Sequence, residues 1–446
     1  MTLRVVVFVS LCVSIGVAWI IESGAADVFL EATRPDFQKI PLGIAGIENM
    51  GGSESPEGRV KLGTRIEDVL KADVRRSLVF ALVDLPSLGI KVSHLGTEPD
   101  ASFKQAAENG VSVIVWGKAG IKGGSKDADL SMDGYVYDAG SNEVVGGKRY
   151  VGSTSVARLM AHRFADELVF RYTGEPGIAR TKIAYVSELG TARELFVMDY
   201  DGYDPRQLTA DGFLNLMPRW SPDRRFLVFT TYRNRNTQDI DMIELATGKR
   251  WTLVAQGGLN ITPVLSPDGN ALAYSSSHEG NAELYRLNTR TKAVQRLTTH
   301  AAGDLSPSWS PSGRELAFTS DRSGGPQIFL MSADGSNVRR LTFDGDYNAA
   351  PAWSPRGNWI AYVCRTPKKE YKLCVITPDG QKHLQLTTGL GVDDSPSWSP
   401  DGRHLVFSST VDGKSQIYMI NADGKDLERI TFTGTHNSAP SWSPAS

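Results

Sequence analysis

The sequence has little net charge and few cysteines, and both shortages narrow the classes of protein to which it can belong. Its 446 residues include 48 basic and 50 acidic side chains, with a formal net charge of −2, and only three cysteines. Because neither sign of charge predominates, the composition does not favour binding to nucleic acid or to an anionic membrane surface.

Common catalytic motifs are also missing. The patterns G-x-S-x-G, H-E-x-x-H and G-x-x-x-x-G-K-[ST] do not occur in the sequence. The seven histidines are scattered along the chain, and an isolated histidine is more often structural than catalytic. We therefore expect a protein that is not an enzyme.

Long apolar runs are scarce as well, since only the run from Val5 to Ile21 approaches the length that spans a membrane. It follows Arg4 and precedes the small residues at 23–26, a layout typical of a secretory signal peptide. We predict a signal peptide over residues 1–26 and an exported mature chain. An uncleaved anchor helix is the alternative.

Two cysteines remain outside this run, Cys364 and Cys374. They are ten residues apart and fall on adjacent strands of one predicted hairpin. An exported chain reaches a compartment that permits oxidation. The pair is a disulfide candidate, and two reduced thiols are the alternative because only some cross-strand pairs have suitable geometry.

What the sequence does contain is an internal repeat that is closed each time by Ser-Pro. The prolines of these segments, most of which read WSP, are Pro222, Pro267, Pro311, Pro355, Pro400 and Pro444, at intervals of 44 or 45 residues. Each repeat also holds an apolar strand that ends in an aromatic residue, a polar turn and two further short strands. Four short antiparallel strands per repeat are typical of a β-propeller blade.

The order of the pieces predicts how the propeller closes. The first repeat begins at Lys182 with its second strand, and the last WSP segment, at 441–444, has no strands after it. If this final strand completes the first blade, the ring has no free sheet edge. We predict an all-β, six-bladed propeller over residues 182–446, with four-stranded antiparallel blades closed by the C-terminal strand.

Residues 27–172 carry no such repeat and alternate apolar stretches with helical patterns. The apolar stretches lie at 28–32, 41–47 and 111–117, and the helical patterns at 65–80, 103–109 and 156–171. This alternation predicts a small α/β domain. Residues 173–181 contain the glycine and proline expected of a linker.

One polar position recurs three residues before the first proline of every segment. It is occupied by Asn215, Asn260, Asp304, Asn348, Asp393 and Asn437. Propeller symmetry would gather these six residues around one mouth of the channel. Asn and Asp also cap turns by bonding their own backbone, so a structural role is the alternative. Asp304 and Asp393 could hold Ca²⁺, which prefers oxygen ligands.

Three segments together resemble the TolB family, the periplasmic component of the Tol-Pal envelope system. They are VLKADVRRSLVF at 69–80, TGEPGIARTKIAYVS at 173–187 and the phased WSPDG repeats. The resemblance implies a periplasmic scaffold that binds the lipoprotein Pal and the membrane protein TolA and supports outer-membrane constriction at division and envelope integrity. It implies no cofactor and no small-molecule substrate.

The resemblance also implies where these partners bind. Pal would dock at the channel mouth, on the six Asn and Asp residues and on the neighbouring Thr262, Ser306, Ala350, Ser395 and Ala439. TolA would bind the mature N-terminus, at Asp27, Val28, Phe29, Leu30, Glu31, Ala32 and Thr33.

Two other functions remain open. A peptidase whose propeller gates a hydrolase domain would need a nucleophile, an acid and a histidine on a further domain. The sequence ends two residues after the last WSP, so we expect no such domain. A propeller that binds carbohydrate or peptidoglycan directly is the third reading.

Overall fold

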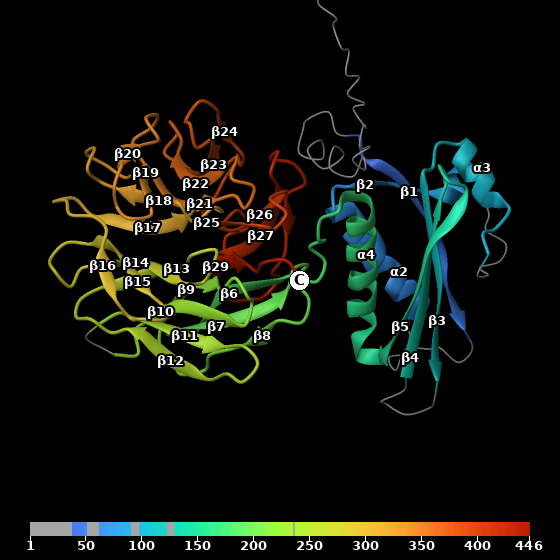
Figure 1. The fold of residues 1–446 in the computed structure, drawn as a ribbon, viewed down its shortest axis with the longest axis horizontal. Coiled ribbons are helices and arrows are strands. Elements are labelled where there is room, and N and C mark those ends of the chain that lie inside the picture. Colours follow the sequence, from blue (N-terminus) through green and yellow to red (C-terminus); the bar gives the residue numbers. More distant parts are fainter. Residues whose placement is uncertain (1–37, 51–61, 91–97, 123–128, 235–236) are drawn as a thin grey trace, which may run out of the picture.

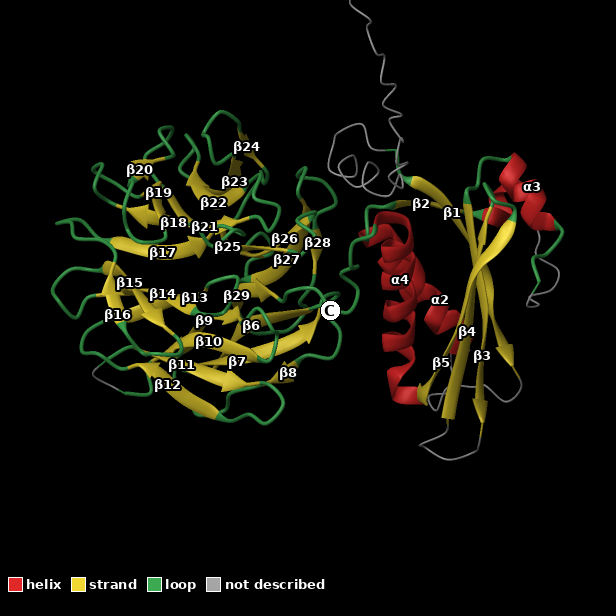
Figure 2. Ribbon diagram, viewed as in Figure 1, coloured by secondary structure: helices red, strands yellow, loops and turns green. Residues whose placement is uncertain are grey.

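The computed structural model describes residues 38–50, 62–90, 98–122, 129–234 and 237–446. The expected signal peptide and the expected TolA-binding segment at 27–33 lie outside these ranges. The described chain forms two bodies side by side, a small α/β domain and a β-propeller (Figure 1). The helices that the structure describes all belong to the α/β domain (Figure 2).

The α/β domain is built on one five-stranded sheet with the strand order β2-β1-β3-β4-β5. Its strands are β1 (Ile40–Met50), β2 (Phe80–Val83), β3 (Val113–Lys122), β4 (Asp129–Asp138) and β5 (Glu143–Ser153). Its α-helices are α2 (Leu62–Arg76), α3 (Ser102–Glu108) and α4 (Ala157–Thr173), with short 3₁₀ turns η1 (Leu85–Leu88) and η2 (Thr154–Val156). Strand β1 runs parallel to β2 and β3, whereas β3, β4 and β5 are antiparallel.

Alternation along β3 explains why helices cover both faces of this sheet. Val113 and Val115 are buried in the core that includes α2 and α4. Ile114 and Trp116 are buried in a second core with Phe103 of α3. Because successive side chains of a strand point to opposite faces, an apolar strand needs cover on both sides. Figure 1 shows α2 and α4 on the side of the sheet that faces the propeller.

The propeller has six four-stranded antiparallel blades, as the repeat predicts. Blade 1 contains β29 (Asn437–Trp442), β6 (Lys182–Leu189), β7 (Ala192–Asp199) and β8 (Arg206–Gln207). Blade 2 contains β9 (Asn215–Trp220), β10 (Phe226–Thr231), β11 (Asp239–Glu244) and β12 (Arg250–Val254), and blade 3 contains β13 (Asn260–Leu265), β14 (Ala271–Ser276), β15 (Glu283–Asn288) and β16 (Val294–Arg296). Blade 4 contains β17 (Asp304–Trp309), β18 (Glu315–Ser320), β19 (Gln327–Ser332) and β20 (Arg339–Arg340), and blade 5 contains β21 (Asn348–Trp353), β22 (Ile360–Arg365), β23 (Tyr371–Ile376) and β24 (His383–Gln385). Blade 6 contains β25 (Asp393–Trp398), β26 (His404–Ser409), β27 (Gln416–Asn421) and β28 (Glu428–Arg429).

The predicted closure of the ring is confirmed. Strand β29 pairs antiparallel with β6, with Asn437 opposite Ser187 and Trp442 opposite Ile183. The indole Nε1 of Trp442 also donates a hydrogen bond to Thr181 Oγ1 over 2.8 Å. The last strand of the chain therefore completes the first blade.

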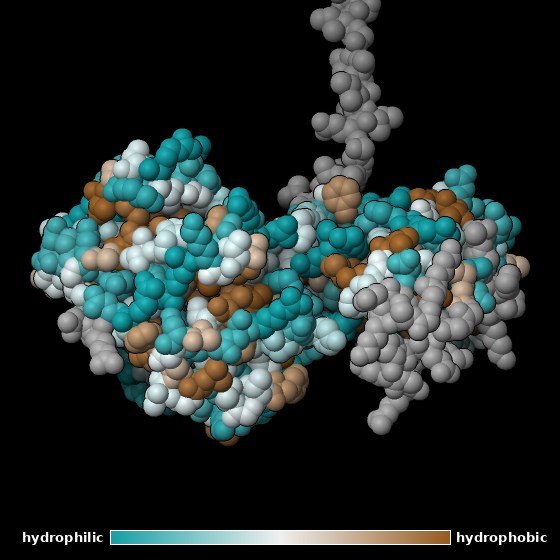
Figure 3. Space-filling view, turned by 90° about the horizontal axis from the view of Figure 1, so that it is seen from below, coloured by the Kyte–Doolittle hydropathy of each residue, from teal (hydrophilic) through white to brown (hydrophobic). Residues whose placement is uncertain are grey.

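The two bodies share one hydrophobic core. Leu70 of α2 and Met160 of α4 are buried in the same cluster as Tyr200, Met419 and Trp442 of the propeller. Figure 3 shows the two bodies in contact from below, with apolar residues in separate patches among hydrophilic ones. A shared apolar core fixes the orientation of the two bodies, because separating them would expose these side chains to water.

The connecting segment 174–181 is held tightly against α4. The carboxylate of Asp166 accepts hydrogen bonds from the backbone N–H of Ala179, over 2.8 Å, and from Arg180 Nε, over 2.7 Å. At Gly177 a Cβ atom would lie 2.8 Å from the Cα of Asp166, so only glycine allows this approach. Glu175 accepts a hydrogen bond from Arg356 of blade 5 over 2.7 Å.

None of the helices described here combines the length and the apolar character needed to cross a membrane.

The disulfide candidate is confirmed, because Cys364 of β22 and Cys374 of β23 are joined. Replacing both cysteines with alanine is expected to lower the free energy of unfolding by about 2–3 kcal/mol, because the bond closes a loop of ten residues in the unfolded chain. Urea unfolding of the wild type, with and without reductant, measures the effect. Reductant should leave the double variant unchanged, and an oxidised wild type no more stable than the variant would contradict the prediction.

Candidate functional site

The propeller has two unlike faces. The inner strands β9, β13, β17, β21, β25 and β29 all begin at one face, which we call the ring face, and end at the WSP turns of the other, the turn face. The described part of the α/β domain contacts the turn face, where Arg158 of α4 pairs with Asp201 and Arg76 of α2 pairs with Glu428. Glu175 of the connecting segment lies within ion-pair distance of Arg356 and Arg403 at the same face. The ring face, at the opposite end of the same strands, is the candidate site for a partner.

The six predicted Asn and Asp residues all begin inner strands at the ring face, and their side chains are buried. Asn348 Nδ2 donates hydrogen bonds to Gln327 Oε1 of blade 4, over 2.9 Å, and to the carbonyl of Asp344, over 2.8 Å. Asn437 Nδ2 donates in the same way to Gln416 Oε1 of blade 6, over 3.0 Å. These hydrogen bonds link blade 5 to blade 4 and blade 1 to blade 6, and we call such a side-chain contact between adjacent blades a clasp.

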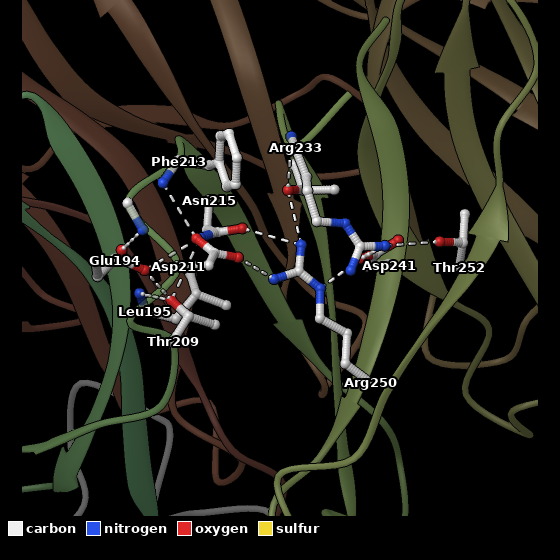
Figure 4. Close-up of polar contacts among 12 residues, drawn as sticks. Glu194, Leu195, Thr209, Asp211, Phe213, Asn215, Arg233, Asp241, Arg250 and Thr252 are labelled. Atoms are coloured by element: carbon white, nitrogen blue, oxygen red, sulfur yellow. Dashed lines mark hydrogen bonds and ion pairs between the residues drawn. The ribbon is translucent and has the colours of Figure 1, made fainter. Parts of the chain in front are cut away.

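Figure 4 shows the most extended of these clasps, around Asn215. Asn215 Nδ2 donates to Glu194 Oε2 over 3.1 Å and to Asp211 Oδ1 over 2.9 Å. Arg250 then pairs with both Asp211 and Asp241. Burial opposes the charge of Asp211, but hydrogen bonds from Asn215 and its other donors hold the pKa of this carboxyl below its usual value.

The two acidic members of the ring, where the sequence indicated that Ca²⁺ could bind, each lie within ion-pair distance of a basic side chain. Asp304 of β17 pairs with Arg322 over 2.7 Å, and Asp393 of β25 pairs with Lys372 over 3.3 Å. Desolvation on burial raises the pKa of Asp304, against the opposing effect of hydrogen bonds from Ser320 and Arg322. Arg322 belongs to blade 4, as Asp304 does, whereas Lys372 belongs to blade 5, which precedes the blade of Asp393. The inner strand β21 lies between the strands of the two aspartates in the ring order.

The second and third residues of the inner strands, which follow the Asn or Asp directly, are half-buried or exposed. The third residue always has a left-handed backbone, with φ between 48° and 55°, and precedes a proline. These residues are Met217, Thr262, Ser306, Ala350, Ser395 and Ala439. The strand pairing shifts register at this point in every blade. Proline has no N–H to leave unpaired at such a bulge.

Met217 was not among the predicted site residues, although it occupies the position of Thr262 in blade 2. Its position in the repeat, directly before Pro218, would have identified it, whereas its side-chain type would not. The other five predicted neighbours occupy this position as expected.

Two charged residues break the symmetry of the channel. Asp394 is exposed at the second position of β25, where other inner strands have apolar residues or serine. Arg219, at the fifth position of β9, is desolvated, which lowers the pKa of its guanidinium, and the charge of Asp394 acts to raise it. A carboxylate near the start of one inner strand and a guanidinium near the end of another therefore interact between blades 6 and 2.

Exposed apolar side chains are also found on the loops of the ring face. Phe343, Leu390, Val392 and Phe432 lie in ring-face loops that connect successive blades, and Val411 lies in the ring-face hairpin between β26 and β27 of blade 6. Large apolar side chains that are exposed around a polar centre are a common feature of protein-binding surfaces.

The clasp between blades 5 and 6 uses a buried ion pair where its neighbours use two amides. Lys372 and Asp393 occupy the positions of Gln327 and Asn348, and both of their side chains are almost fully buried. Replacing Lys372 with glutamine is expected to lower the free energy of unfolding by about 3–5 kcal/mol, because Asp393 would stay buried without a cation.

The double variant Lys372→Gln, Asp393→Asn restores the amide pair found in the adjacent blade and should recover most of this loss. Urea unfolding of the wild type, both single variants and the double variant measures the coupling. A double variant as unstable as Lys372→Gln alone would show that the two residues do not act as a pair.

A family model, a curated relative and a solved structure that are similar to this chain all carry the name TolB. The family described as the TolB beta propeller domain matches residues 169–373 and 366–446. A protein of Gluconobacter oxydans named Tol-Pal system protein TolB is 33% identical over 434 residues, which cover 94% of this chain and 89% of that protein. The crystal structure of TolB from Acinetobacter baumannii has a TM-score of 0.74 at 26% identity and covers 91% of this chain and 97% of that chain.

A further relative, the Tol-Pal system protein TolB of Desulfosudis oleivorans, is 33% identical over 271 residues. This match covers 60% of the length of each protein. The similarity to the Gluconobacter and Acinetobacter proteins therefore extends over both bodies of the structure, whereas the Desulfosudis match covers a part of the chain.

Proposed function

The chain belongs to the TolB family, and from this premise we propose that it is a periplasmic, non-catalytic scaffold of the Tol-Pal system. We propose that Pal docks on the ring face of the propeller and that TolA binds residues 27–33 at the mature N-terminus. In this role the protein supports outer-membrane constriction at division and the integrity of the envelope.

The proposal that Pal binds here rests on the side chains exposed on the ring face. The ring face combines an exposed carboxylate, Asp394, with exposed apolar side chains on its loops, and the described α/β domain contacts the opposite face. Clasps between adjacent blades hold the strand starts beneath this surface at a common level. A preformed surface of this kind loses little conformational entropy when a partner binds.

Leu390 offers the sharpest test of this surface, because 78% of it is exposed in the loop before β25. Replacing Leu390 with glutamate is expected to weaken Pal binding by at least about tenfold, since it places a charge in the apolar part of the contact. Isothermal titration with the soluble domain of Pal measures the affinity.

Leu384 provides the matched control, because it is 54% exposed on the outer strand β24 of blade 5. Replacing Leu384 with glutamate should leave the affinity unchanged. If the two variants bind Pal equally well, the ring face around Leu390 is not the docking surface.

The proposed TolA site rests on the family membership, because residues 27–33 lie outside the described ranges. Deleting these seven residues should abolish capture of TolA in a pull-down and leave the affinity for Pal unchanged. Replacing them with a scrambled sequence of the same composition provides the control for length and charge. Capture of TolA by the deleted protein would rule out this segment as the site.

A further inference from the structure

A compact cluster of potential metal ligands lies where the α/β domain meets the propeller. His162 projects from α4, and Asp199 and Asp201 come from the end of β7 and the turn that follows it. One ring nitrogen of His162 and one carboxylate oxygen from each aspartate all lie within 4.8 Å of one another. These residues belong to neither the ring face nor the N-terminal segment.

The imidazole of His162 is buried and held in a fixed orientation. Only 2% of this residue is exposed, and its Nδ1 lies 2.7 Å from Asp73 Oδ2. Asp73 is itself held by Tyr200, whose hydroxyl donates to Asp73 Oδ1 over 2.6 Å. A carboxylate that orients the second nitrogen of a histidine in this way is typical of histidines that bind metals.

The other nitrogen, His162 Nε2, is buried and has no hydrogen-bond partner among the described residues. A buried polar atom without a partner is costly, so its presence at a carboxylate cluster needs an explanation. With Nδ1 engaged by Asp73, Nε2 is the nitrogen that remains available to a ligand.

The three aspartates at this boundary, Asp73, Asp199 and Asp201, have only two lysine or arginine partners among the described residues. Arg158 pairs with Asp201, and Lys182 Nζ lies 2.6 Å from Asp199 Oδ1. Within the described ranges Asp73 has no lysine or arginine partner, and Arg76 beside it pairs with Glu428. A neutral His162 would therefore leave one buried negative charge uncompensated, which is unfavourable in a site of low polarity.

We propose that His162 Nε2 and the carboxylates of Asp199 and Asp201 form a site for Zn²⁺ that links the α/β domain to blade 1. Zinc accepts imidazole nitrogen and carboxylate oxygen together and commonly takes three protein ligands and a water molecule. Calcium and magnesium prefer ligand sets made of oxygen. Lys182 is half-exposed, so its ammonium group can move away when the metal binds Asp199.

The full-length mature protein, stripped of metal by a chelator, tests this site with Zn²⁺ alone. Titration calorimetry should show one Zn²⁺ bound per chain, and the thermal midpoint should rise with the Zn²⁺ concentration because the ion binds the folded state. Replacing Asp199 with asparagine should weaken Zn²⁺ binding by at least about tenfold, which corresponds to about 1.4 kcal/mol.

Asp204 supplies the matched control, since it is an exposed aspartate in the same β7–β8 connection and pairs with Arg206. Asp204→Asn should bind Zn²⁺ as the wild type does, and Lys182→Gln should bind it more tightly because a competing cation is removed. Asp199 is partly exposed, so its variant is expected to fold, and circular dichroism checks this.

Two results would overturn the proposal. The first is the absence of any Zn²⁺-dependent heat or thermal shift in the stripped wild type, which would leave a proton on His162 as the occupant. The second is equal Zn²⁺ affinity in Asp199→Asn and Asp204→Asn, which would place the ion on surface histidines elsewhere.

Discussion

The pairing of β29 with β6 is the constraint on which the rest of the structure depends. It joins the last strand of the chain to the first strand of the propeller and leaves no free edge in the ring. The same strand reaches its neighbours on both sides: the backbone N–H of Trp442 donates to Ser397 Oγ of blade 6, and its indole donates to Thr181 of the connecting segment. The same strand, β29, therefore both closes the propeller and contacts the segment that connects it to the α/β domain.

Closure also explains why the two faces differ. All six inner strands run in the same direction, so the buried Asn and Asp clasps gather at one face and the WSP turns gather at the other. The turn face is used within the molecule, through Glu175, Arg356 and Arg403. The ring face keeps its apolar loops exposed and is the face that we assign to a partner. The proposed zinc site lies at the internal boundary and would act on how firmly the two bodies are held together.

Much of the fold could be predicted from the sequence, because a phased repeat reports strand content, blade number and closure directly. The details of the site could not. The burial of Asn348 depends on a bulge one residue further on and on Gln327, a partner from another blade. The neutralisation of Asp393 depends on Lys372, which occupies a position held by glutamine in the adjacent blades. The contact between His162 and Asp73 joins two helices whose packing no local pattern reveals. Side-chain environments of this kind are set by tertiary contacts between distant segments, whereas periodicity predicts only the local structure.

Hydrogen exchange followed by mass spectrometry tests the closure most directly, because it reports the opening of individual strand pairs. In the native protein the amides of 183–187 and 437–442 should exchange as slowly as those of the equivalent pair in blade 5, β21 and β22. A C-terminal peptide that exchanges within seconds, while the other blades stay protected, would contradict a ring closed by β29.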